Sequence, residues 1–109
     1  MKYKINKYFI SIMFTYNIAY AYTADCVIKW FDTGETQKFY IVVKNGKMIR
    51  YASYGTFVEY YRGKENGYFH YNAGDGDYET YLGKFKNGKF SYSTTASNGD
   101  GLSGMCTLR

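Results

Sequence analysis

The chain of 109 residues is poor in the residue types that most often carry out chemistry. It has no proline, two cysteines and a single histidine, His70. His70 lies in the segment YFHYN, where tyrosines flank it and no serine, cysteine or carboxylate is grouped around it. A lone histidine on a strand is usually structural, because general acid–base catalysis needs a partner within hydrogen-bond reach. We therefore expect no enzymatic activity and no cofactor. The alternative is a small hydrolase in which His70 pairs with Glu59 or Glu79.

The first residues lack acidic side chains and have the layout of a secretory signal peptide. The opening MKYKINKY carries three lysines, and the apolar stretch FISIMFTYNIAYAYTA follows it. This stretch is too short and too polar for a membrane-spanning anchor. Ala19 and Ala21 supply the small side chains that signal peptidase needs, so we expect cleavage after Ala21, with a cut after Ala24 as second choice. We predict a leader at 1–21, a single small domain at 22–109, and export to a periplasm or the outside of the cell.

Loss of the leader removes most of the positive charge of the chain. Three of the 14 basic residues belong to the leader, whereas none of the nine acidic residues does. A nucleic-acid surface needs a clustered basic face. The one loose group beyond the leader brackets a turn and is expected to be solvated; it consists of Lys84, Lys86 and Lys89. We therefore expect no nucleic-acid partner, and no stable membrane insertion after cleavage.

The two cysteines are Cys26, close to the expected cleavage site, and Cys106, close to the last residue. Asp25 immediately precedes Cys26, where lipidation needs a small residue. A reactive thiol needs a base or a cationic neighbour that lowers its pKa, and the sequence around Cys26 offers none. In an exported chain with two cysteines, a disulfide is the default expectation. We predict a Cys26–Cys106 disulfide.

The remaining sequence is typical of an all-β domain. Aromatic and β-branched residues are frequent, turn signals recur every eight to twelve residues, and no helical period is present. Asn45-Gly46 separates two such runs and predicts a tight hairpin, because both turn residues need positive φ. The expected strands are 26–31, 36–44, 47–54, 56–62, 68–72, 78–85, 89–93 and 102–108.

Alternation along these strands predicts which side chains point inward. Cys26 and Ile28 share a face of the first strand, and Leu102 and Cys106 share a face of the last. If these two strands lie side by side, the meander closes and the disulfide joins its ends. We therefore predict a small antiparallel meander of about eight strands, forming a closed or nearly closed barrel, with a β-sandwich as the alternative. Closure removes exposed strand edges, and the large side chains should fill the interior.

A possible calcium loop is the weakest of the motifs. Asp75, Asp77 and Glu79 alternate in the sequence, but the further oxygen ligands that a calcium loop needs are absent. We interpret the segment as a solvated Asp-Gly turn and predict no metal site.

Tyrosine is the most unusual part of the composition, with 15 copies in the chain and 11 of them after the expected leader. A domain this small cannot bury all of them, so several rings should be exposed. Tyrosine gives a large contact area at low entropic cost and keeps a polar tip. We predict a non-catalytic binding module that recognises a protein or a glycan through surface tyrosines, although cross-strand pairing that only stiffens the sheet accounts for them equally well. The candidate residues are Tyr51, Tyr54, Tyr60, Tyr61, Tyr68 and Tyr71.

Two further functions are consistent with the same sequence. In size, leader, terminal cysteines and meander, the chain resembles the small disulfide-closed β-barrels that inhibit host lysozymes. That resemblance implies inhibition of a host hydrolase, and Ser103-Gly104 matches the serine-glycine of their inhibitory loop, although Met105 follows it here. The other alternative is an envelope structural component whose aromatic face packs against copies of itself.

Overall fold

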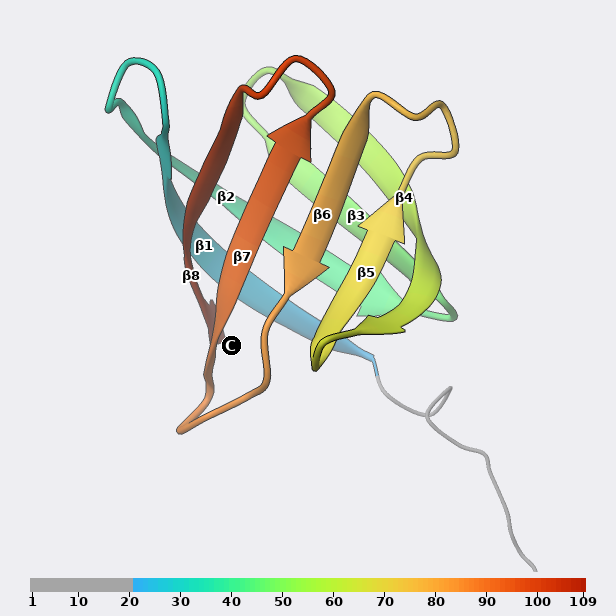
Figure 1. Cartoon of the computed structure of the whole chain (residues 1–109). Coiled ribbons are helices and arrows are strands. Elements are labelled where there is room, and N and C mark those ends of the chain that lie inside the picture. Colours follow the sequence, from blue (N-terminus) through green and yellow to red (C-terminus); the bar gives the residue numbers. More distant parts are fainter. Residues whose placement is uncertain (1–20) are drawn as a thin grey trace, which may run out of the picture.

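Eight strands follow one another along residues 21–109, the part of the chain that this computed structural model describes (Figure 1). They are β1 (Tyr22–Trp30), β2 (Thr36–Lys44), β3 (Lys47–Ala52), β4 (Gly55–Glu65), β5 (Tyr68–Asn72), β6 (Tyr78–Leu82), β7 (Lys89–Ala96) and β8 (Gly101–Leu108). Within this range, no helix is long and apolar enough to cross a membrane. The leader expected at 1–21 lies, except for its last residue, outside the described residues.

Each strand pairs antiparallel with the next, and β8 pairs with β1, which closes the barrel. The β1–β8 ladder runs from Ala24 opposite Leu108 to Trp30 opposite Leu102. The predicted closed barrel of eight strands is therefore confirmed. Because the sheet has no free edge, every strand of the barrel has a hydrogen-bonded neighbour on each side.

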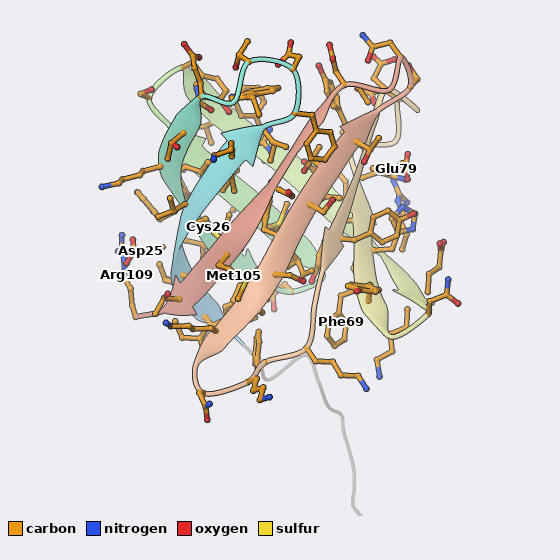
Figure 2. The ribbon with its side chains drawn as sticks, turned by 60° about the vertical axis from the view of Figure 1, so that its left-hand side comes forward. Asp25, Cys26, Phe69, Glu79, Met105 and Arg109 are labelled. Carbon is orange, nitrogen blue, oxygen red and sulfur yellow. A yellow bond between two sulfur atoms is a disulfide. The ribbon has the colours of Figure 1, made fainter. Side chains whose placement is uncertain are left out.

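The disulfide lies on the seam between the first and last strands. Cys26 and Cys106 are directly opposite each other, with Cα atoms 4.0 Å apart, and both are buried inside the barrel (Figure 2). The predicted disulfide is confirmed, and it is compatible with an oxidising, exported compartment. Close approach at the seam also needs Gly104, since a Cβ on this residue would lie 2.0 Å from the Val27 carbonyl oxygen.

Three Asn-Gly turns connect alternate hairpins. The asparagines and glycines of 45–46, 66–67 and 87–88 all have positive φ, as two-residue turns between twisted strands require. The hairpin expected at Asn45-Gly46 is confirmed. These turns link β2 to β3, β4 to β5, and β6 to β7, and they therefore lie at the same end of the barrel.

The inward-facing side chains form one hydrophobic core, and the alternation predicted for the first and last strands, β1 and β8, is confirmed. The strand β1 begins at Tyr22, four residues before the predicted start at Cys26, because Tyr22 to Asp25 pair with Val43 to Tyr40 of β2. The core includes Ala24, Cys26, Ile28, Phe39, Ile41, Val43, Met48, Tyr71, Leu82, Phe90, Tyr92, Leu102 and Cys106.

Candidate functional site

The six candidate tyrosines do not gather on one surface. Tyr51 and Tyr60 lie on the outer face of β3 and β4, Tyr68 lies on the outer face of β5, and Tyr54 belongs to the turn between β3 and β4. Tyr54, Tyr60, Tyr61 and Tyr68 are exposed. Tyr61, however, packs its ring against Phe69 and Tyr71 on the inner side of the sheet.

The expectation that Tyr71 is exposed is wrong. Its side chain is 6% exposed and belongs to the core. His70 and Asn72 on either side contact polar groups on the outer surface, so the strand alternation turns Tyr71 inward. Burial raises the pKa of its hydroxyl to about 12. A recognition role that needs the Tyr71 ring at the surface is therefore excluded.

Tyr51 and Tyr60 belong to a continuous apolar surface on the outside of the barrel. Across three strands, Val42, Ile49 and Val58 stand opposite one another in register. Tyr40 and Tyr51 stack beside this row, with ring centroids 4.8 Å apart. Val58 and Tyr60 are 39% and 42% exposed. We call this surface the β2–β4 face; it comprises Tyr40, Val42, Ile49, Tyr51, Val58 and Tyr60.

Cationic side chains lie at two edges of the β2–β4 face. Lys44 and Lys47 are exposed and directly opposite each other across the hairpin turn, and Lys47 is also opposite Tyr60. Like charges in directly opposite positions of a sheet repel each other. The guanidinium of Arg62 lies 5.9 Å from the centre of the Tyr60 ring. Among residues 21–109 neither lysine has an ion-pair partner, so the lysine pair gives this edge of the face an unbalanced positive charge.

Arg109 adds a further cation at the opposite edge of the face. Its guanidinium lies 4.6 Å from the centre of the Tyr40 ring and makes a 3.0 Å contact with the carboxylate of Asp25 (Figure 2). The hydrogen bond from Arg109 holds the pKa of the Asp25 carboxyl below its usual value. This pair joins β1 to the residue after β8 on the outer surface, with the Arg109 guanidinium against the Tyr40 ring.

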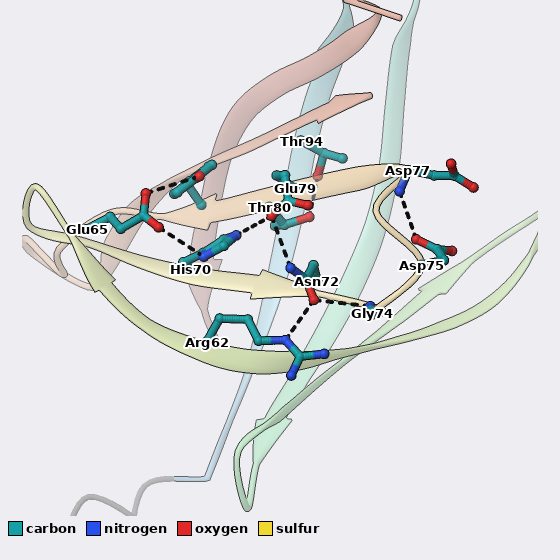
Figure 3. A network of polar contacts seen from close by, with 11 residues as sticks. Arg62, Glu65, His70, Asn72, Gly74, Asp75, Asp77, Glu79, Thr80 and Thr94 are labelled. Atoms are coloured by element: carbon teal, nitrogen blue, oxygen red, sulfur yellow. Dashed lines mark hydrogen bonds and ion pairs between the residues drawn. The ribbon is translucent and has the colours of Figure 1, made fainter. Parts of the chain in front are cut away.

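His70 forms a separate polar network on β4, β5 and β6 (Figure 3). Its Nε2 contacts the Glu79 carboxylate, its Nδ1 lies 3.4 Å from Glu65, and its ring stacks on Tyr81. Asn72 donates a hydrogen bond of 3.1 Å to Glu79, which lowers the pKa of that carboxyl. Both imidazole nitrogens therefore face a carboxylate, and the histidine links three strands.

A bulge in β4 brings Glu65 into this network. The register shifts between Tyr61 and Gly63, and Gly63 has a φ of 114°. One extra residue reverses the alternation, so Lys64 covers the inward Phe69 ring while Glu65 points outward beside His70. A glycine inside a strand-like run is the sequence signal for such a bulge, whereas the strand predicted at 56–62 ends before Gly63.

Of the two expected carboxylate partners, His70 contacts Glu79, whereas Glu59 lies inside the barrel. The Glu59 carboxylate is 3.8 Å from the Arg50 guanidinium, which also donates a 2.7 Å hydrogen bond to the Tyr92 hydroxyl. Burial raises the pKa of the Glu59 carboxyl, opposed by a hydrogen bond from Thr80 and by the charge of Arg50. One oxygen of Glu59 and the Arg50 Nε are buried without a protein partner.

The two remaining sequence motifs have structural roles. Asp77 donates its backbone N–H to the Asp75 carboxylate at 3.0 Å, which forms a local turn. Across residues 21–109, no group of three or more His, Cys, Asp or Glu side chains is arranged to hold a metal ion. Ser103 and Gly104 lie in the middle of β8 rather than in a loop.

Comparisons with family models, curated proteins and solved structures find no match to this chain. The candidate site therefore rests on the chemistry of its own residues. Sequence reasoning had identified Tyr51 and Tyr60, but it missed the aliphatic row between them and the lysine pair beside it. The alternation of 47–54 and 56–62 contained a signal for the row, because Ile49 and Val58 occupy outward positions of adjacent strands.

Proposed function

We propose that the protein is an exported, non-catalytic binding module that docks through its β2–β4 face onto an acidic partner protein. The observation that carries this proposal is the row of Val42, Ile49 and Val58 on the outside of a closed barrel. The barrel buries its core on the inner side, so these outward aliphatic side chains lie outside the core, and Val58 is 39% exposed. Contiguous outward apolar surface of this kind is characteristic of interaction sites.

The chemistry around the row favours a protein over a glycan. Aliphatic side chains cannot hydrogen-bond to sugar hydroxyls, whereas an apolar centre with a charged rim is the usual anatomy of a protein interface. Lys44 and Lys47 repel each other in the free protein, and a carboxylate placed between them relieves that repulsion. Tyr51 and Tyr60 contribute large rings with polar tips beside the row.

The same charges disfavour self-association through this face. A two-fold dimer brings the same patch of both copies together, and here it places the lysine pairs of both copies in one interface. Like charges across an interface oppose binding. A partner of opposite charge is therefore a better match than a second copy. Inhibition of a hydrolase is one form that such docking can take, if the β2–β4 face covers the cleft of an acidic enzyme.

Two observations support the absence of catalysis and the export in this proposal. Both nitrogens of His70 face carboxylates, which leaves neither of them open to act on a substrate. The buried disulfide fits an oxidising compartment.

The test uses cross-linking of the oxidised protein to proteins of the extracytoplasmic fraction of its host. The variant K44E/K47E reverses the charge beside the face, and K86E/K89E makes the same charge change at the β6–β7 turn. We expect acidic proteins to cross-link next to Val58 and Tyr60. These cross-links should be lost with K44E/K47E and retained with K86E/K89E, and their yield should fall as the salt concentration is raised. Equal loss in both variants, or capture that survives protease treatment of the fraction, contradicts the proposal.

A further inference from the structure

A second surface feature lies on the other side of the barrel, where β6, β7 and β8 form an open groove of about 530 Å³. Its lining includes Tyr68, Tyr81, Ser91, Ser93, Ser103 and Met105. In the register, Tyr81 is opposite Ser93, and Ser93 is opposite Ser103. Ser91 is opposite Met105, which is 50% exposed. The groove thus has a floor of serines between two tyrosines on one side and a methionine on the other.

Small residues create this groove. Gly83, the residue after β6, has no side chain, and the Ser91 hydroxyl of β7 occupies the space beside it. A Cβ on Gly83 would lie only 2.3 Å from the Ser91 Oγ. The short serine side chains therefore form the bottom of the groove, and the larger tyrosine rings form its wall. In the described part of the chain, the hydroxyls of Ser91, Ser93 and Ser103 make no hydrogen bond to other protein groups. Each can both donate to and accept from a ligand.

The Tyr81 ring is held in a fixed orientation against the groove. Its plane is within 9° of the His70 ring, at a centroid distance of 4.8 Å, which equals the usual spacing between neighbouring strands. The two rings are therefore stacked along the direction from β5 to β6, and the free face of Tyr81 is turned towards Ser93 on β7. The Tyr81 hydroxyl donates to Glu65 at 3.4 Å, which holds the tip of the ring.

We propose that this groove binds a neutral oligosaccharide. The C–H face of a sugar ring is attracted to the negative face of an aromatic ring, and the serine floor offers three hydroxyl groups to sugar hydroxyls. The lining residues carry no charge, so nothing in the groove would pair with an acidic or basic sugar. This ligand class differs from the acidic protein proposed for the β2–β4 face, and the two sites are independent.

An extended peptide fits the groove less well. Peptides that add to a sheet need an unpaired strand edge, and here β6, β7 and β8 are all paired on both sides. A peptide would therefore have to cover the floor without backbone pairing to the barrel. A sugar needs no such pairing, because its hydroxyls reach the serine side chains directly.

The test titrates the oxidised protein, with amide NMR signals as readout, against three neutral hexasaccharides: cellohexaose, maltohexaose and chitohexaose. We expect at least one to shift the signals of residues 91–93 and 103–105. Y81A should weaken that binding at least tenfold, and S103L, which fills the floor, at least fivefold. Y81F keeps the ring and loses only the Glu65 contact, so it should stay within threefold of the unchanged protein.

The matched control is Y51A, which removes an aromatic ring from the β2–β4 face and should leave sugar binding unchanged. Absence of groove shifts with all three sugars overturns the proposal. Shifts that are unchanged in S103L also overturn the proposal. This second variant keeps the test decisive if Y81A fails to fold. Binding of an acidic oligosaccharide such as hexagalacturonate in preference to the neutral ones also overturns it.

Discussion

At the scale of single residues, the interior carboxylate Glu59 is the least expected feature. Carboxylates are seldom fully buried unless they are paired, and Glu59 is 5% exposed with only Arg50 and Thr80 to compensate. The net effect of burial is to raise the pKa of its carboxyl above the usual 4.5. Its ionised form is therefore better solvated in the unfolded chain than in the barrel.

This residue predicts how stability depends on pH. A raised folded-state pKa contributes stability that is fully present below the unfolded value and is lost as pH rises through the folded value. E59Q removes that titration and keeps the shape of the side chain. We therefore expect the melting temperature of E59Q, relative to that of the unchanged protein, to increase as pH rises from 4 to 8. A difference that stays constant over this range would show that Glu59 does not titrate differently in the folded state.

At the scale of the strands, the β4 bulge decides which charges meet on the outer surface. It turns Glu65 outward and so places a second carboxylate beside His70. The bulge depends on Gly63, whose φ of 114° is costly for any residue with a side chain. The contact between His70 and Glu65 is therefore a consequence of one glycine.

The variant G63A should be destabilised by roughly 1 to 3 kcal/mol, the usual cost of a strained backbone conformation. Urea unfolding, monitored by tryptophan fluorescence, measures this change in stability. The matched control is G34A in the β1–β2 loop, where φ is 73°, close to the left-handed region that side chains tolerate better. The free energy of unfolding should fall less in G34A than in G63A. Equal losses in the two variants would mean that the bulge has no special requirement for glycine.

At the scale of the whole molecule, the disulfide lies at the same seam where the barrel closes. The bond between Cys26 and Cys106 joins residues 80 apart in sequence at the seam where β1 meets β8. In the chain-entropy account, a covalent loop of this length restricts the unfolded state and is worth about 4.5 kcal/mol, although measured values are often lower. The total stability of a small domain is usually about 5 to 15 kcal/mol.

The variant C26A/C106A should accordingly lose about 2 to 4.5 kcal/mol in urea unfolding. The m-value should increase, because the unfolded chain without the bond is more expanded. The barrel should still form, since the β1–β8 ladder does not depend on the sulfur atoms. A fold that is absent in C26A/C106A at low temperature would show instead that the ladder alone cannot close the sheet.

The sequence allowed prediction of features that depend on local pattern. The Asn45-Gly46 hairpin follows from the turn residues, and closure follows from two cysteines on the apolar faces of the first and last strands. Features that depend on the register of distant strands were not predictable. Contact between Arg50 and Tyr92 is an example, because they lie on β3 and β7 and meet only across the barrel interior.

The candidate site shows the same division. Tyr51 and Tyr60 were identified from composition alone, whereas Tyr71 was misplaced because its orientation depends on which neighbours in β5 face outward. The groove combines residues of β5, β6, β7 and β8. Serine is too common in strands for the sequence to have indicated that three of its hydroxyls form one floor.

The position of the disulfide also determines how the domain responds to mechanical force. Tension applied through the segments on either side of Cys26 and Cys106 passes directly from one sulfur to the other, so the chain between them carries no load. In a single-molecule pulling experiment, the oxidised protein should show almost no increase in length on unfolding. The reduced protein should extend by the length of the unfolded chain between Cys26 and Cys106. A long extension of the oxidised form would contradict this. A domain built in this way can be pulled between two attachments while the strands between the two cysteines stay folded.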